Sequence, residues 1–223
     1  MPGLLSIQIA KPSFHGFAGA TDLHDKPWET AFFKQTITGQ VIVTPTGLVG
    51  DGQADSVNHG GVDKAICCYA SEHFPHWRSI AGLEQMGPGG FGENFTTEGL
   101  IESEICIGDI FTCGTATFQI TQPRQPCWKL SRRWRTKSLS AWVEKNGLTG
   151  WYFRVLSEGT VKSGDTFQLV ERFNPGWSIA RANEIAHHRN DDREQVMALA
   201  HVPHLSASWR EGFSRLAKSL PET

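Results

Sequence analysis

Short apolar runs recur along the chain before residue 175, and each is closed by Gly, Asp, Pro or Asn. The runs read LLSIQIA, QVIVTPTGLVGDG, KAICCYA, EICIGDIFTC, ATFQITQP, WYFRVL and TFQLVERF. Apolar runs of a few residues between turn-forming residues are typical of β-strands. The pattern therefore predicts a mainly β core.

Two stretches repeat one spacing of turn residues. ICIGDIF (residues 105–111) and VKSGDTF (residues 161–167) share an aliphatic residue, a Gly-Asp pair and a final Phe at the same intervals. Glycine can take a positive φ, and aspartate can accept a hydrogen bond from the backbone of the same turn. We predict a tight turn in each stretch, which suits a barrel or a sandwich.

Two helical segments are predicted between the strands. The first is EHFPHWRSI, for which Ser71 can act as the N-cap while Pro75 falls in the first turn. The second is SLSAWVEKN, which Gly147 should end. We interpret both as insertions on the barrel.

The pattern changes after the Pro-Gly pair of FNPGW. Three helical segments follow, SIARANEIAHHR, DREQVMALAHV and SASWREGFSRLAKSL, and in the last one Ser208 and Glu211 stand at the spacing of a capping box. The sequence thus predicts a β domain over residues 1–173 and a three-helix domain over residues 178–219.

Composition narrows the possible partners. The chain has 223 residues, of which 39% are hydrophobic and 20% charged, and its net charge is -2, as in ordinary globular proteins. A pI near 6.5 lacks the positive field of a nucleic-acid-binding protein. The N-terminus has no cationic start before a long apolar core, and no segment is long enough to cross a bilayer. We expect a cytoplasmic protein with no nucleic-acid or membrane partner.

The five cysteines form an odd set, without the paired spacings of a zinc site or the density of a disulfide scaffold. Cys67, Cys68 and Cys106 have apolar sequence neighbours, where a free thiol usually behaves as a small buried hydrophobe. We therefore expect no chemistry from these three.

The segment NHGGVDKA, residues 58–65, is a first candidate for ligand binding. Its candidate residues are His59, Gly60, Gly61, Asp63 and Lys64. Glycines expose backbone N–H groups and the lysine adds a positive charge, so the segment could cradle an anion. A plain hairpin turn explains the same residues equally well.

The segment GPGGFGENFTTEGL, residues 87–100, is a second candidate. Its glycines, Gly92 among them, allow close backbone approach, while Glu93 and Asn94 supply hydrogen-bonding groups. A flexible loop is the alternative. Phe91 and Phe95 bracket this group, and two large apolar anchors favour a fixed loop.

The segment QPRQPCWKL is the third candidate, because its two prolines impose an extended path that ends at Cys127. Four cations lie nearby in the sequence: Arg124, Lys129, Arg132 and Arg133. Neighbouring cations lower the pKa of a thiol, and the thiolate attacks electrophiles or binds soft metals. An inert cysteine remains an alternative, as does a cysteine hydrolase with His59 as its base, although no known hydrolase signature surrounds Cys127.

Taken together and in order, GDGQAD, HGGVDKAICCY, FGENFTTEGL, ICIGDIF and QPRQPCWKL resemble the MOSC family, named for the C-terminal domain of molybdenum cofactor sulfurase. The likeness covers about residues 40 to 170, and the C-terminal segments resemble the three-helix appendage of one bacterial branch. The resemblance implies a MOSC-type β-barrel with inserted helices and a small C-terminal helical domain. It also implies the molybdenum cofactor, a pterin dithiolene with a terminal phosphate.

The resemblance further implies roles for individual residues. Cys127 would be the catalytic residue and the protein ligand to molybdenum, a role that suits a soft thiolate. Pterin and phosphate would be held by His59, Gly60, Gly61, Asp63, Lys64, Gly92, Glu93, Asn94 and Arg124.

The bacterial branch implies a reductase that removes the hydroxyl oxygen of N-hydroxylated compounds, such as 6-hydroxylaminopurine, in a two-electron reaction. A separate reductase should supply the electrons, because the sequence contains no flavin or nicotinamide fingerprint. Trp128, Trp151 and Phe95 are candidates for stacking on a flat substrate. A homodimer is expected from the resemblance alone.

Two other functions stay open. Cys127 could carry a persulfide in a sulfur-transfer protein, or the domain could bind the cofactor without catalysis.

Overall fold

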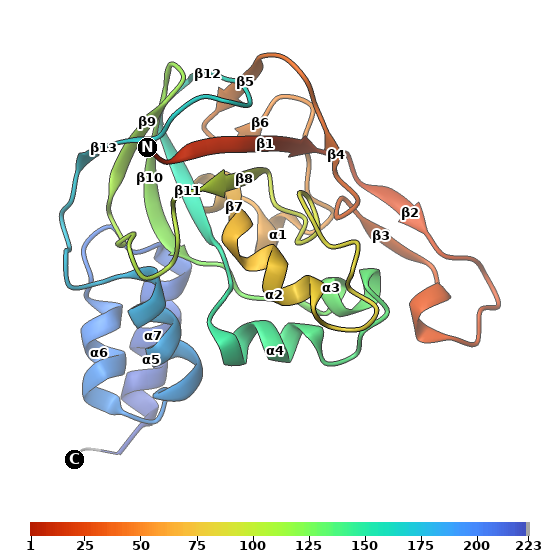
Figure 1. Cartoon of the computed structure of the whole chain (residues 1–223). Coiled ribbons are helices and arrows are strands. Elements are labelled where there is room, and N and C mark those ends of the chain that lie inside the picture. The colour runs from red at the N-terminus through yellow and green to blue at the C-terminus, as the bar shows by residue number, and fades with distance from the viewer. Residues whose placement is uncertain (222–223) are drawn as a thin grey trace.

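Within residues 1–221, the part that this computed structural model describes, a large mixed sheet is followed by a group of three helices (Figure 1). The sheet has eight strands in the order β13-β9-β10-β11-β7-β8-β1-β4. Their bounds are β1 Gly3–Ile9, β4 Gln35–Thr36, β7 Ile66–Ala70, β8 Phe95–Glu98, β9 Ile110–Cys113, β10 Ala116–Pro123, β11 Trp151–Ser157 and β13 Gln168–Glu171. Only β7 and β8 pair in parallel among these neighbours.

The sheet curls because β1 also bonds to the chain just before β13. Leu4 N donates to Asp165 O at 2.8 Å, and Phe167 N donates to Pro2 O at 2.9 Å. These bonds bring opposite ends of the sheet together and pair backbone groups that an open edge would expose. The predicted mainly β, barrel-like fold is thereby confirmed.

Two smaller sheets complete the β structure. The first has the order β12-β5-β6, with β5 Val41–Thr44, β6 Gly47–Leu48 and β12 Gly159–Val161. The second pairs β2 Ser13–His15 with β3 Trp28–Thr30, and it projects from the body of the molecule (Figure 1). The sequence pattern did not predict β2, β3, β4, β8 or β12.

Strand β8 shows why the pattern missed some strands. Its segment FTTE was interpreted as part of the glycine-rich loop, yet Thr96 and Thr97 are both 0% exposed. The strand lies between β1 and β7, which cover both of its edges. Threonine suits strands, but burial of these polar side chains depends on neighbours from distant segments.

Both predicted Gly-Asp turns are confirmed. The Asp109 carboxylate accepts the N–H of Cys106 at 2.8 Å, and the Asp165 carboxylate accepts that of Lys162 at 2.8 Å. The glycine before each aspartate has a φ of 87° or 92°. The repeated sequence therefore encodes the same local hydrogen-bonded turn twice.

The inserted helices are short. They are α1 Ser56–His59, α2 Phe74–Arg78, α3 Trp128–Arg133 and α4 Leu139–Asn146, with 3-10 turns η1 Leu23–Asp25, η2 Val62–Lys64 and η3 Ser71–His73. Gly147 ends α4 at a φ of 67°, as predicted. Ser71 does not cap α2: it begins η3, and α2 follows with Pro75 in its first turn.

The three predicted C-terminal helices are present as α5 Ile179–His188, α6 Arg193–Ala200 and α7 Ala207–Ser219. The N-cap of α7 is Ser206, whose hydroxyl accepts the N–H of Trp209, so the predicted cap at Ser208 is wrong by two residues. Trp209 and Ala217 are buried in the core that the helices share with the barrel. The appendage is thus packed onto the barrel by apolar contacts.

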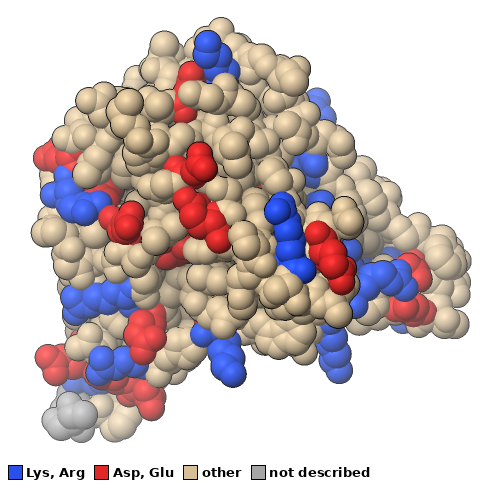
Figure 2. All heavy atoms as spheres, in the orientation of Figure 1, with Lys and Arg blue, Asp and Glu red and all other residues tan. Residues whose placement is uncertain are grey.

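Two further observations concern the charged side chains of one face and the length and sequence of the helices. Figure 2 shows Lys and Arg side chains mixed with Asp and Glu side chains over the face it presents. A membrane-spanning helix, which needs both length and an apolar sequence, does not occur within residues 1–221.

The close packing of Gly150 against β7 can be tested by substitution. A Cβ at this position would lie 2.2 Å from the Cys68 carbonyl oxygen, and the residue has a φ of 74°. We expect Gly150→Ala to lower the free energy of unfolding by about 3 kcal/mol or more. Gly147→Ala is the control: its φ is 67° but its Cβ would meet open space, so about 1 kcal/mol is expected. Equal losses in denaturant unfolding would contradict the packing argument.

Candidate functional site

Two adjoining cavities lie beside the ends of β7, β10 and β11. The inner cavity is lined by residues 30–32, Lys34, residues 52–55, His59, Lys64, Cys67, Phe91, Gly92, Asn94, Arg124, Cys127, Lys129 and Tyr152. The outer cavity shares Asp55, His59, Lys64, Cys127 and Tyr152 and adds Asn58, Gln122, Gln125, Pro126 and Trp128. They enclose about 80 and 310 Å³, and together they reach the size of small-molecule sites.

Cys127 lies where the two cavities meet. It occupies the residue before α3, at the end of the extended path from Pro123, and Ser140 Oγ donates to its carbonyl oxygen at 2.8 Å. Its side chain is half-buried, whereas the other four cysteines are buried. Cys127 is therefore the thiol best placed to meet a ligand.

Arg124 supplies a buried positive charge to the inner cavity. The residue is 4% exposed, and its Nη2 donates to Phe91 O at 2.8 Å. Its Nη1 is buried without a hydrogen-bond partner in the described part of the chain. A buried guanidinium donor without an acceptor is costly, so the site is suited to an anion that would accept from it.

Three lysines add to this positive charge. Lys34 pairs with buried Asp51, Lys64 Nζ donates to Asn58 O at 2.7 Å, and Lys129 lines the inner cavity. Burial lowers the pKa of Lys64, although Asp63 and Asp55 oppose the shift. The inner cavity thus collects cations from three separate segments.

Arg132 and Arg133 do not join this group. Arg132 donates to the carbonyls of His24 and Lys26, and Arg133 Nη1 donates to Phe32 O at 2.6 Å. Both guanidinium groups also lie over aromatic rings. Of the four cations expected around Cys127, only Arg124 and Lys129 line its cavity.

His59 ends α1 and lines both cavities. Burial lowers its pKa to about 4, with help from the positive charges of Arg124, Lys129 and Lys64 and against the opposing charge of Asp55. The imidazole is therefore neutral at pH 7. It can donate or accept a hydrogen bond there, but it adds no positive charge.

The glycine-rich loop is held from behind by Glu93. This carboxylate is 0% exposed and accepts N–H groups from Gly89 at 2.6 Å and Phe91 at 3.0 Å, and the Thr96 hydroxyl at 2.9 Å. Burial raises its pKa, and these hydrogen bonds oppose the shift. Glu93 does not line either cavity, so its geometry is that of a loop support and not of a cofactor contact.

Gly92 and Asn94 do line the inner cavity. Gly92 has a φ of 71°, and a Cβ there would lie 2.9 Å from the Phe32 ring. Asn94 accepts the N–H of Cys67 at 3.1 Å and donates to Asp51 Oδ2 at 2.7 Å. Its amide therefore holds the cavity wall in place through both of its polar atoms.

The segment NHGGVDKA forms α1 followed by η2, so the hairpin alternative is wrong. Gly60 and Gly61 connect the two turns without lining either cavity. Asp63 does not line them either. Its carboxylate pairs with Arg154 at 2.7 Å and accepts the N–H of Ala207 at 2.8 Å, which ties the barrel to α7.

Several cavity residues carry no clear signal in the sequence. They are Lys34, Cys67 and Tyr152, with Asp51 behind Lys34. Cys67 was expected to be inert; burial raises its pKa to about 11, although nearby Arg124 opposes the shift. Asp51 belongs to the GDGQAD segment, whereas no local signal marks Lys34.

The expected stacking by Trp151 and Phe95 is wrong, because both are 0% exposed in the core, while Trp128 is 55% exposed beside the outer cavity.

Comparisons with known proteins agree with this architecture. Residues 55–168 match the MOSC domain, which is half of the chain. The protein belongs to the MOSC domain family. Residues 177–218 match the YiiM-like, 3-alpha helix domain.

Relatives of this MOSC protein cover most of its length. It is 38% identical to YflK of Bacillus subtilis (strain 168) over 212 residues. The aligned region covers 95% of this chain and 93% of YflK. The crystal structure of YiiM from Geobacillus stearothermophilus is 35% identical, with a TM-score of 0.79 over 97% of this chain and 100% of that one. A protein named Reductase from Gibberella moniliformis (strain M3125 / FGSC 7600) is 35% identical over 164 residues, 72% of this chain and 29% of that protein.

His59 can report on the burial of the inner cavity and on anion binding there. We expect its imidazole NMR signals to show no titration between about pH 5 and 8 in the free protein. Added inorganic phosphate should raise its pKa, because an anion offsets the positive charges of Arg124 and Lys129. An unperturbed pKa in the free protein would contradict the burial of His59, and no response to phosphate would show that the cavity does not bind an anion.

Asp63 can be tested as a structural residue. We expect Asp63→Ala to lower the free energy of unfolding by about 1–3 kcal/mol, because Arg154 and the N–H of Ala207 lose their partner. Asp191→Ala, at an exposed position, should have little effect. Phosphate affinity, measured by the His59 shift, should stay near that of the unsubstituted protein. A large loss of phosphate affinity at unchanged stability would instead place Asp63 in ligand binding.

Proposed function

We propose that this MOSC protein is a molybdenum-cofactor-dependent reductase of N-hydroxylated compounds. One observation carries the proposal: the half-buried Cys127 thiol and the unpartnered Nη1 of Arg124 line one positively charged cavity. A soft thiolate suits molybdenum, and cations with buried donors suit a phosphate. Membership in the MOSC family and the relative named Reductase support the cofactor and the reaction class.

One buried donor in the cavity fits the proposed cofactor. The buried Arg124 donor lacks an acceptor, which a phosphate oxygen would supply. When bound, the cofactor supplies the two-electron redox chemistry, and the protein supplies orientation and a fixed charge environment.

Each group of residues would have a distinct task. Cys127 would hold molybdenum, and Arg124, Lys64 and Lys129 would hold the phosphate end. Neutral His59 would hydrogen-bond to the pterin or to the substrate. Behind them, Glu93 keeps the glycine-rich loop in place, and it would act without touching the cofactor.

The substrate would enter through the outer cavity. This cavity opens beside Trp128, whose exposed ring would pack against a flat substrate. A small N-hydroxylated compound would meet Cys127 where the two cavities join. Electrons would come from a separate reductase, and a homodimer remains an expectation.

The proposal is tested with protein produced in a host that makes the molybdenum cofactor. We expect stoichiometric molybdenum and pterin, and reduction of 6-hydroxylaminopurine when a competent reductase is present. Cys127→Ala should abolish turnover and deplete bound molybdenum, because the soft ligand is lost. Cys113→Ala is the matched control, since that thiol is buried outside both cavities.

The other outcomes separate the alternatives. A labile sulfur adduct on Cys127 by mass spectrometry, with no pterin, would favour sulfur transfer. Bound pterin without turnover of any N-hydroxylated compound would favour a binding module. Active protein that carries neither molybdenum nor pterin would refute the proposal.

A further inference from the structure

A separate cavity of about 340 Å³ lies between the barrel and the helical appendage. We name it the seam cavity; it is lined by His73, residues 101–103, residues 145–148, Ala180, Asn183, Glu184 and His188. None of these residues lines the inner or outer cavity. The seam cavity is therefore distinct from the proposed molybdenum site.

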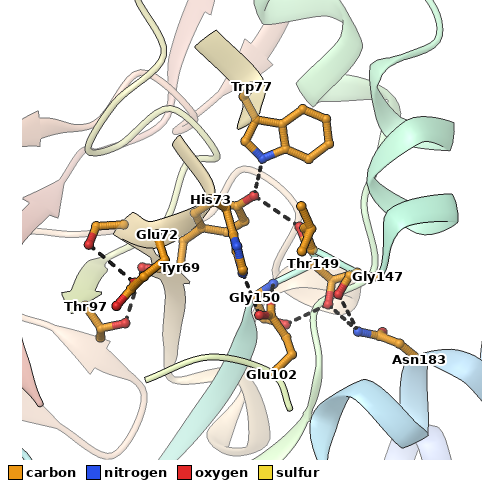
Figure 3. Close-up of polar contacts among 12 residues, drawn as sticks. Tyr69, Glu72, His73, Trp77, Thr97, Glu102, Gly147, Thr149, Gly150 and Asn183 are labelled. Carbon is orange, nitrogen blue, oxygen red and sulfur yellow. Dashed lines mark hydrogen bonds and ion pairs between the residues drawn. The ribbon is translucent and has the colours of Figure 1, made fainter. Parts of the chain in front are cut away.

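Its inner wall holds a buried hydrogen-bonded pair, His73 and Glu102. His73 Nε2 lies 2.6 Å from Glu102 Oε2, and the residues are 9% and 4% exposed. Glu102 Oε1 also accepts the N–H of Gly150 at 2.8 Å (Figure 3). Each carboxylate oxygen has two acceptor sites, so one more donor can bind to each. The pair thus gives the cavity a fixed, acceptor-rich wall.

Asn183 adds an acceptor with no partner. The residue is 2% exposed, and its Nδ2 donates to Gly147 O at 3.1 Å and Thr149 Oγ1 at 2.8 Å (Figure 3). A carbonyl oxygen can only accept, so the amide orientation is fixed with Nδ2 toward Gly147. Oδ1 then has no donor within residues 1–221. A buried, unsatisfied acceptor costs about 1–3 kcal/mol, which a ligand N–H would offset.

The helix end and the free acceptors at the cavity favour a ligand that brings a positive donor group. The C-terminal end of α4 lies at the cavity, where the helix carries partial negative charge. The Glu184 carboxylate stands at the exposed rim, with Lys145 and His188 opposing it there. In the described part of the chain, no group of three His, Cys, Asp or Glu side chains is arranged to hold a metal ion.

We propose that the seam cavity binds a small organic cation with N–H donors, an alkylammonium or amidinium group. The N–H groups would donate to Asn183 Oδ1 and to the Glu102 carboxylate. A planar amidinium presents two such donors side by side, as a guanidinium does toward carboxylates. This inference does not depend on the proposed reductase function.

The test uses the full chain without molybdenum cofactor and follows its backbone and side-chain amide signals by NMR. Acetamidinium chloride is the probe, and tetramethylammonium chloride is a cation of equal charge without N–H donors. We expect saturable shifts of the Asn183 side-chain amide and of the Gly147 and Gly150 amides with acetamidinium alone. Equal shifts with both salts, or no saturation, would overturn the proposal and leave water as the partner of Asn183.

Substitutions locate the binding. Asn183→Leu should weaken acetamidinium binding about tenfold or more, but it also removes bonds that hold α5. Ala180→Leu therefore serves as the second variant. Ala180 lines the cavity, so the larger side chain would fill it, and leucine is a good helix former. This substitution leaves the side-chain hydrogen bonds of Asn183 and Glu102 intact. Ala141→Leu, at an exposed position of α4, is the matched control. Unchanged affinity in folded Ala180→Leu would overturn the assignment.

Because this experiment needs no cofactor, its failure leaves the proposed reductase function untouched.

Discussion

The backbone of Gly150 connects the inner cavity with the seam cavity. Its N–H donates to the buried Glu102 carboxylate at 2.8 Å, and its carbonyl accepts the N–H of Arg124 at 3.0 Å. The residue also packs so closely against the Cys68 carbonyl that only glycine fits. One residue thus sets where Arg124 enters the inner cavity and where Glu102 faces the seam cavity.

Around the inner cavity, charged residues divide into those that face a ligand and those that hold the wall. Arg124 and Lys64 face the space beside Cys127. The Glu93 carboxylate accepts hydrogen bonds from the glycine-rich loop. The Asp51 carboxylate accepts hydrogen bonds from Lys34, Asn94 and the N–H of Ala10. Buried carboxylates need such partners, so Glu93 and Asp51 stabilise the loops. Asp51 offsets the charge of Lys34, whereas the Nη1 of Arg124 has no partner within residues 1–221.

The helical appendage is joined to the barrel by polar contacts as well as by the shared core. Asp63 binds the first turn of α7, and Asn183 of α5 binds the turn that ends α4. The first contact lies next in sequence to Lys64, and the second lies close to Gly150. The appendage is therefore connected to the walls of the inner cavity and of the seam cavity. Among the inner, outer and seam cavities, its described residues line the seam cavity alone.

The sequence by itself determined the β character, the two Gly-Asp turns, the stop of α4 at Gly147 and the three C-terminal helices, because each depends on neighbouring residues. It also identified Cys127 and Arg124 as candidate site residues, because the neighbouring prolines fix the local backbone path. Only the tertiary structure decided which cations meet the thiol. It turned Arg132 away, brought in Lys34 from a distant segment and buried Glu93, because these placements depend on contacts between segments that lie far apart along the chain.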